Sequence, residues 1–505
     1  MGRGRVSEKA LGAWLSAASA AGDRVQAAQA AAEALAGDPW AVVEQAGHLA
    51  RATIGRAEID VAWRTREGGV FWFPAGGPIP ETDPASHQRE GTFDTPRAMA
   101  REVVSIALRS SRRPVERALD PTCGCGAMLV ALDEAGLGAV SAGAELDPAA
   151  AAVAQVAAPR ARVRVADCID EVEEADLIVG NPPFVAPRHQ SLDLRRRLRA
   201  RLPWIEGRCD LALAVAALAA ERLRPGGGLG LVLPAGLLFE PYGRPLRARW
   251  LGAHALTAVE GPRAFPAAAV RVFLVGLCAG AGPAALPGGI DASELLALPG
   301  HPLDPALRAG DAALWARVAA ASTPLGSLCW IDTGVVCHGP GGGKARLLTD
   351  VAEPGAVPFV DAADLIAGRR RFLRYRPEEM HRAKSPALFA GEKLLVQRIL
   401  GDGALRCWVD DSGLYAGHTL TVVSPRVGSP RAALLQGLLE DPRTAGLLRL
   451  RRGWRVDLYP QDLASLPVPQ AWLLGRPLEE DATWGLDAAG GDRLRALARR
   501  GPPRG

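Results

Sequence analysis

The first feature of the sequence with chemical content is a turn that follows the apolar run 176–179. Its residues are Asn181-Pro182-Pro183-Phe184. Two consecutive prolines fix their own φ angles and supply no N–H donor, so the turn is rigid and its carbonyl oxygens face outward. The Asn181 side-chain oxygen and the Pro182 carbonyl can accept both hydrogens of an amino group, while the Phe184 ring can stack on a planar base. The turn therefore predicts a reaction at an amino group that is conjugated to a ring. The nitrogen of such a group becomes nucleophilic once both of its hydrogens donate hydrogen bonds to these acceptors.

A glycine-rich turn ends an earlier apolar run, 115–119, and precedes a helical segment at 127–135. Its residues are Asp120-Pro121-Thr122-Cys123-Gly124-Cys125-Gly126. A ligand can approach the backbone at Gly124 and Gly126, where a Cβ would exclude it, and Asp120 can bind a cationic amino group. The turn lacks both a lysine and the phosphate-loop spacing, so it predicts a nucleoside ligand without phosphates. A tight turn with no ligand is the alternative.

Two further acids end the next two apolar runs. Glu145 lies about twenty residues after the glycines, where an acid can accept both hydroxyls of a ribose. Asp167 ends the following run, and its carboxylate can accept an exocyclic adenine amine. Each acid alone is more often a helix N-cap. Three acids at three successive strand ends nevertheless predict one binding site, because the carboxyl ends of parallel strands meet at the same edge of a sheet.

The elements that must position these residues are short apolar runs alternating with helical segments between about residues 92 and 279. This alternation predicts an α/β fold in which helices cover both faces of a parallel sheet. The predicted strands are 115–119, 139–145, 162–166, 176–179, 229–233 and 270–277.

Taken in order, these segments resemble the gamma class of N6-adenine DNA methyltransferases, the Taq-like family. The resemblance is close over residues 91–280 and loose beyond them. The motifs that carry it are Thr92-Phe93-Asp94-Thr95-Pro96, residues 120–126, Glu145-Leu146-Asp147-Pro148, Asp167, residues 181–184, Asp210, Arg224-Pro225-Gly226-Gly227-Gly228, Leu233-Pro234 and Phe265-Pro266. The resemblance implies a Rossmann-like class I methyltransferase sheet and S-adenosyl-L-methionine as cofactor. It also implies methyl transfer to N6 of an adenine flipped out of double-stranded DNA.

The resemblance also assigns individual roles. Thr95 and Asp120 would help hold the methionine end of the cofactor, Glu145 its ribose and Asp167 its adenine. Phe265 matches a second aromatic residue that contacts the target base. Cys168 departs from the family, which often has a bulky apolar residue there, and predicts weaker cofactor stacking. The complete expected cofactor site is Thr95, Pro96, Asp120, Pro121, Cys123, Gly124, Gly126, Glu145, Leu146, Asp167, Cys168 and Asn181.

An arginine-rich segment, 188–208, follows the catalytic turn directly. Leu194, Leu198 and Leu202 recur at helical spacing and predict a helix with one apolar side. The arginines of the exposed side would contact DNA phosphates beside the flipped base, and a solvated surface helix is the alternative. The arginines expected at the DNA backbone are Arg188, Arg195, Arg196, Arg197 and Arg199.

The 505-residue length predicts several folded units. The expected division is a helical N-terminal extension (1–88), the methyltransferase domain (89–285), a linker (286–322), a mixed α+β target-recognition domain (323–475) and a partly disordered tail (476–505). Five arginines within residues 369–376, and a predicted strand at 393–398 with basic ends, supply positive charge in the expected recognition domain.

Composition narrows the class of protein. With 48% hydrophobic and 23% charged residues, the chain is predicted to be a globular cytoplasmic protein, and no apolar run is long enough to cross a membrane. The eight cysteines lack zinc-ligand spacing, so no metal is expected and buried thiols are favoured. No lysine follows an acid at the spacing of a D/E-x-K nuclease motif, which argues against a fused nuclease.

Three functions remain open at the level of sequence. The expected one is site-specific adenine methylation of duplex DNA in a restriction-modification or related defence system, with a separate restriction or defence subunit as a further partner. The second is methylation of rRNA or of a protein glutamine by the same catalytic domain. The third is a non-catalytic DNA-binding or specificity subunit, which the intact Asn181 to Phe184 turn disfavours.

Overall fold

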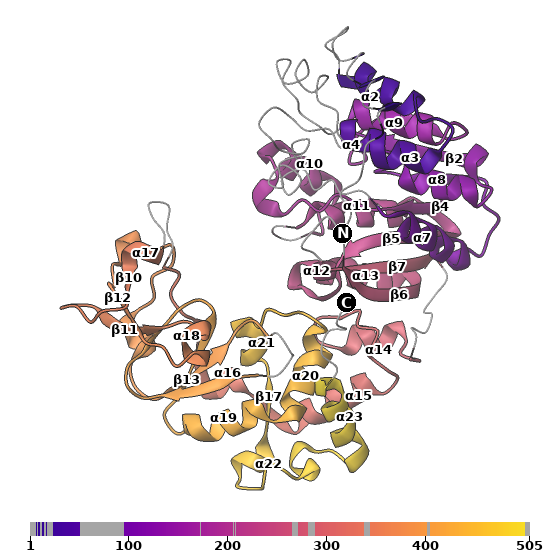
Figure 1. Cartoon of the computed structure of the whole chain (residues 1–505). Coiled ribbons are helices and arrows are strands. Elements are labelled where there is room, and N and C mark those ends of the chain that lie inside the picture. Colours follow the sequence, from indigo (N-terminus) through magenta and orange to yellow (C-terminus); the bar gives the residue numbers. More distant parts are fainter. Residues whose placement is uncertain are drawn as a thin grey trace. The chain divides into compact units, whose positions relative to one another are not determined.

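The structure is a computed structural model. It describes residues 7, 9–10, 13–14, 17, 24–50, 95–171, 173–205, 207, 209–264, 271–280, 288–337, 344–400 and 405–499, and Phe265 lies outside them. The chain forms two compact units that divide between Ser293 and Glu294 (Figure 1). Among the described residues, none of the helices combines the length and apolar character needed to cross a membrane.

The first unit is built on a seven-stranded sheet in the order β3-β2-β1-β4-β5-β7-β6. Strands β1 to β5 pair in parallel, whereas β7 is antiparallel to both β5 and β6. The strands are β1 (Ala118–Asp120), β2 (Ser141–Glu145), β3 (Arg162–Val165), β4 (Ala175–Gly180), β5 (Leu223–Pro234), β6 (His254–Ala264) and β7 (Arg271–Ala279). This largely parallel sheet confirms the predicted α/β fold.

The strand order reverses between β1 and β4. The chain passes from β1 outward through β2 to β3 and then returns to the other side of β1. Ligands bind at such a switch point, beyond the carboxyl ends of the strands. Asp120 is the last residue of β1, and Asn181 directly follows β4. The topology therefore brings the glycine-rich turn and the catalytic turn together, although Gly126 and Gly180 lie 54 positions apart in the sequence.

Two glycines of β5 let helix α7 (Arg97–Ser110) lie close to the sheet. A Cβ on Gly228 would come 2.1 Å from the Ala107 carbonyl oxygen, and one on Gly230 would come 2.5 Å from that of Val103. Both oxygens belong to α7, so larger residues would push the helix away. Because Thr95 lies just before α7, this close packing also sets its position beside the site.

The other helices of this unit include α8 (Ala127–Glu134), α9 (Pro148–Ala157), α10 (Leu192–Arg201), α11 (Leu211–Glu221) and α13 (Arg244–Ala253). The described N-terminal residues 24–50 are also helical, as their Ala-rich composition predicts. They form α2 (Arg24–Glu33), α3 (Pro39–Ala41), the π-helical turn η1 (Val42–Ala46) and α4 (Gly47–Ala50). Helix α2 packs on α9 through small side chains, with Ala27, Ala28, Ala31 and Ala32 fully buried (Figure 1).

The second unit contains two four-stranded sheets. One has the order β14-β13-β16-β9 and is antiparallel; the other has the order β10-β12-β11-β15. Their strands are β9 (Cys329–Thr333), β10 (Leu348–Thr349), β11 (Val357–Val360), β12 (Arg371–Leu373), β13 (Lys393–Gln397), β14 (Cys407–Asp410), β15 (Tyr415–Ala416) and β16 (Leu420–Pro425). The helices include α15 (Asp311–Ala320), α19 (Ala432–Glu440), α20 (Pro442–Arg452) and α23 (Ala488–Arg499).

Two expected segments differ from the structure. Part of the expected linker, 286–322, belongs to the second unit: Asp304 is fully buried and accepts hydrogen bonds from Arg449 at 2.8 Å and Trp454 at 2.6 Å. The tail beyond residue 475 is ordered as far as Arg499, because α23 packs on α20 and Trp484 is fully buried. Gly490 and Gly491 of this tail lie within α23, and residues 500–505 are outside the described residues.

Candidate active site

The side chain of Thr95 fixes the orientation of Asn181 in the catalytic turn. The Asn181 Nδ2 donates a hydrogen bond to the Thr95 Oγ1 at 3.1 Å, and Thr95 is buried. This bond directs the nitrogen of the carboxamide toward α7, and so directs its oxygen elsewhere. Thr95, expected at the methionine end of the cofactor, is thus also the residue that orients Asn181.

The side chain of Gln190 bonds to the backbone that follows the catalytic turn. The sequence does not reveal this role. Its Nε2 donates to the Val185 carbonyl at 3.0 Å and to the Cys209 carbonyl at 2.8 Å, and the side chain is buried. The Val185 N–H donates to the Pro183 carbonyl at 3.1 Å, which closes the turn. Gln190 lies in an arginine-rich stretch of the sequence, and no sequence pattern there indicates that its side chain is buried.

Asp120 is a buried carboxyl group at the end of β1, only 1% exposed. Its Oδ1 accepts a hydrogen bond from the Thr122 N–H at 3.0 Å. Burial, reinforced by the negative charge of Glu145, raises the pKa of Asp120 to about 7. A cation bound next to it would stabilise the ionised carboxylate, so the site fits the ammonium group of an amino acid.

Glu145 ties the end of β2 to the glycine-rich turn. Its Oε2 accepts from the Gly124 N–H at 2.9 Å and its Oε1 from the Asp147 N–H at 2.9 Å. A carboxylate oxygen can accept more than one hydrogen bond, so these bonds are compatible with the binding of ribose hydroxyls. Gly124 has φ +53° and a Cβ there would meet nothing within 4 Å, so the space above the turn is open to a ligand.

Asp167, the acid expected to hold the cofactor adenine, contacts an arginine of α10. Arg197 Nη2 donates to Asp167 Oδ2 at 2.6 Å, and Arg197 also pairs with Asp170 at 2.8 Å. These carboxylates raise the pKa of the Arg197 guanidinium. Arg197 is therefore half-buried rather than on the exposed side of α10, and its expected contact with DNA stays a prediction. Next to Asp167, Cys168 is buried, and burial raises the pKa of its thiol to about 12.

The other arginines of the segment fall into two groups: one bonds within the unit, and the others are exposed to solvent. Helix α10 forms as predicted, with Leu198 and Leu202 buried. Arg195 is half-buried and donates to the Pro187 carbonyl at 2.7 Å. Arg196 and Arg199 are exposed, as is Arg188, whose Nε donates to the His189 ring at 3.0 Å.

Five of the predicted site residues line one small cavity of about 40 Å³ at the carboxyl ends of β1 and β4, whereas Glu145, Asp167 and Phe184 do not border it. Its walls include Val43, Thr95, Asp120, Cys123, Gly124 and Asn181. Val43, from the N-terminal helices, is a wall residue that the sequence does not indicate. The structure thus brings the glycine-rich turn, Thr95 and Asn181 together.

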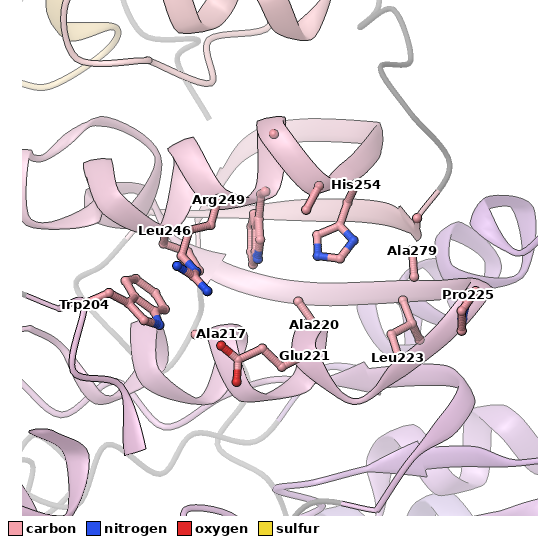
Figure 2. Close-up of a pocket in the computed structure, with 14 residues that line it drawn as sticks. Trp204, Ala217, Ala220, Glu221, Leu223, Pro225, Leu246, Arg249, His254 and Ala279 are labelled. Carbon is pink, nitrogen blue, oxygen red and sulfur yellow. The ribbon is translucent and has the colours of Figure 1, made fainter. Parts of the chain in front are cut away.

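A larger cavity of about 520 Å³ lies at the opposite, amino end of the parallel strands (Figure 2). It is lined by α11, α13 and the ends of β5, β6 and β7, and Arg249 stacks over the Trp204 ring at 4.6 Å. None of the predicted site residues borders it. Size alone would favour this cavity, but Asp120, the glycine-rich turn and Asn181 meet in the smaller one, which we take as the active site.

In the second unit, most of the predicted basic residues are neutralised. Arg369 and Arg371 pair with Asp364, Arg374 with Glu353 and Arg376 with Glu379. Lys393 is fully buried, where it pairs with Asp410 and donates to the Phe389 carbonyl at 2.7 Å. By contrast, Trp330 is 61% exposed and Arg426 lies 3.6 Å from its ring centroid. Arg371 and Lys393 are thus tied into the fold, whereas Arg369 and Arg376 are paired but remain exposed.

A sheet of this order, with the acid of β1 buried beside the glycine-rich turn and a further acid on the next strand, is that of a class I methyltransferase that uses S-adenosylmethionine. Residues 81–259, about a third of the chain, match the family model for N-6 DNA methylase, which supports a DNA methyltransferase in this part of the chain.

The chain is similar to several solved structures. The type IIL restriction-modification enzyme MmeI in complex with DNA is 15% identical, with a TM-score of 0.51 over 81% of this chain and 73% of that one. The DrdV–DNA complex is 12% identical, with a TM-score of 0.47 over 69% of this chain and 51% of that one. A class I S-adenosylmethionine-dependent methyltransferase from Listeria monocytogenes is 12% identical, with a TM-score of 0.36 over 54% and 87%. No curated protein sequence matches the chain.

Proposed function

We propose that the chain transfers a methyl group from S-adenosylmethionine to N6 of an adenine flipped out of a specific duplex DNA sequence. One observation carries this proposal: Asn181, oriented by Thr95, lines the same cavity as the buried carboxyl of Asp120. A cofactor held at Asp120 and Glu145 and an amine held at Asn181 would meet there.

The residues of the catalytic turn would activate the amine by position. The Asn181 oxygen and the Pro182 carbonyl accept its two hydrogens and favour a tetrahedral nitrogen whose lone pair faces the methyl donor. The cofactor supplies a sulfonium methyl group, which is reactive enough that orientation lowers most of the barrier. Phe184 is 9% exposed and would contact the base through that remaining surface, with Phe265 as the second expected aromatic contact.

The choice of DNA over rRNA or a protein glutamine rests on the second unit. A catalytic turn recognises an adenine only after it leaves the stack, so selection among adenines requires contacts made elsewhere. We assign these contacts to residues 323–475, within a unit with two four-stranded sheets that amino methylation alone would not require. The solved structure of MmeI, which shares the fold, is a complex with DNA. A restriction-modification or defence system, with a separate restriction or defence subunit, is the setting we propose.

Sequencing-based mapping of modified bases tests the proposal. The chain is expressed in a bacterial host that lacks adenine methylation, and N6-methyladenine is expected at one short sequence motif. The Asn181→Ala variant should leave DNA unmodified while binding S-adenosylmethionine with nearly unchanged affinity in calorimetry. Unmodified DNA together with a new methyl group in rRNA or on a protein glutamine would replace the proposal by its alternative.

A further inference from the structure

One wall of the cofactor site is formed by a residue of the N-terminal helices, outside the methyltransferase sheet. Val43, in η1, lines the cavity with Thr95, Asp120 and Asn181 and is 2% exposed. Its neighbour Val42 is fully buried but does not line the cavity. A π-helical turn is wider than an α-helical one, and such turns are frequent at functional sites.

One strong contact fixes the N-terminal helices to the site. The Trp40 ring is buried, its Nε1 donates to Glu134 Oε1 at 2.8 Å, and Arg97 lies over the ring at 5.2 Å. Hydrogen bonds from Arg101, with support from Trp40, lower the pKa of Glu134 to about 2. Arg97 opens α7, which Thr95 precedes, and Glu134 ends α8, whose first turn lines the cavity, so the segment that carries Val43 is anchored to both helices.

A second contact is weaker and lies beside the ribose acid. Arg24 forms an ion pair with Asp147, two residues after Glu145, and donates to the Ala50 carbonyl at 2.7 Å. The two charged side chains are 46% and 32% exposed, so water screens the pair and it can break at little cost.

The size of the cavity gives these helices a role in binding. The cavity is narrow, about 40 Å³, so a side chain on its wall lies close to any ligand group bound there. The sheet side of the cavity is held by strand pairing, and the Val43 side by helix packing and an exposed ion pair.

We propose that residues 24–50 form a lid on the cofactor site, with Val43 as the side chain that contacts the methionine end of S-adenosylmethionine. This inference rests on the assignment of S-adenosylmethionine to the cavity and adds the role of the N-terminal helices, which the catalytic motifs leave undefined.

Calorimetry with S-adenosylmethionine and S-adenosylhomocysteine on the full chain tests the lid. Val43→Ala should weaken both ligands about 3- to 10-fold, because two methyl groups that pack on the ligand are removed. Val43→Phe should weaken them more than about 100-fold by filling the cavity. Val42→Ala is the matched control: the same change in the same turn, expected to lower the melting temperature and leave both affinities unchanged.

Hydrogen exchange supplies a readout that does not depend on substitution. In the unmodified chain, the cofactor should slow amide exchange in residues 24–50 as well as in residues 120–126. The lid is overturned if Val43→Ala and Val42→Ala have equal affinities, or if protection stays within the sheet and its turns. Failure of the unmodified chain to bind either ligand would instead overturn the cofactor assignment itself.

Discussion

At the scale of single residues, the site depends on carboxyl groups in unequal surroundings. Asp120 is buried, and burial raises its pKa to about 7, whereas Glu145 is partly exposed and accepts two backbone N–H groups. A buried acid must ionise to hold a cation, so the affinity for the cofactor should depend on pH through Asp120. The burial of this carboxyl group also lowers the free energy of unfolding at pH values where it is ionised.

Cofactor affinity is therefore expected to rise with pH through about 7, as Asp120 loses its proton. Binding of S-adenosylmethionine measured by calorimetry should be several-fold tighter at pH 8 than at pH 6. In the Asp120→Asn variant, affinity should fall and the pH dependence should disappear. A variant that keeps the pH dependence would assign it to another group.

The same residue makes an opposite prediction for stability. Between the usual carboxyl pKa and about 7, the folded chain holds a proton on Asp120 that the unfolded chain has released, so stability falls as pH rises through this window. The carboxamide of the Asp120→Asn variant does not titrate. The stability of that variant relative to the unmodified chain should rise by about 2 kcal/mol between pH 5.5 and pH 8, measured by denaturant unfolding.

At the scale of elements, α10 performs two tasks. Its arginines at 195 and 197 bond within the unit, and those at 196 and 199 face solvent. A helix with four charged residues on nearly adjacent positions presents them in several directions, so they cannot all reach one DNA strand.

We expect Arg196 and Arg199, rather than Arg197, to set the salt dependence of DNA binding. Replacing both by Ala should flatten the slope of log affinity against log salt by about 0.9 for each phosphate that the variant no longer neutralises. Arg197→Ala is the contrasting variant, which should change cofactor affinity and leave the slope nearly unchanged. An unaltered slope in the double variant would leave α10 as a solvated surface helix.

The sequence predicts most of this unit because apolar runs and strand-end acids follow the period and order of an α/β sheet. It predicts six of the seven strands but not β6, which includes Gly261 and Pro262 and carries a weak apolar pattern. Val43, Gln190 and the Arg197–Asp167 bond are missed, because each depends on which segments tertiary packing brings together. No local spacing encodes such a contact.

At the scale of the whole molecule, the two units have separate cores and separate tasks in our proposal. The second unit begins before the buried Asp304, so a cut that removes it cleanly falls near Gly280. Within the second unit, salt bridges occupy most of the expected basic residues, so we expect recognition to involve exposed groups such as Trp330, against whose ring the half-buried Arg426 lies.

A chain shortened to end at Gly280 should still bind S-adenosylmethionine but lose site-specific methylation of duplex DNA. Thermal unfolding and cofactor calorimetry verify that the remaining unit is folded, and base mapping measures the loss. Retention of the same site preference would move recognition to the N-terminal helices or to residues 188–208.

The bond between Arg197 and Asp167 has a consequence for how the two substrates influence each other. The same carboxylate oxygen cannot serve the guanidinium and a cofactor adenine equally well, so whatever draws Arg197 away changes the free energy of cofactor binding. If duplex bound at Arg196 and Arg199 shifts α10 and so loosens this bond, the two ligands share one thermodynamic cycle. Duplex would then raise the affinity for S-adenosylmethionine, and S-adenosylmethionine would raise the affinity for duplex by the same factor.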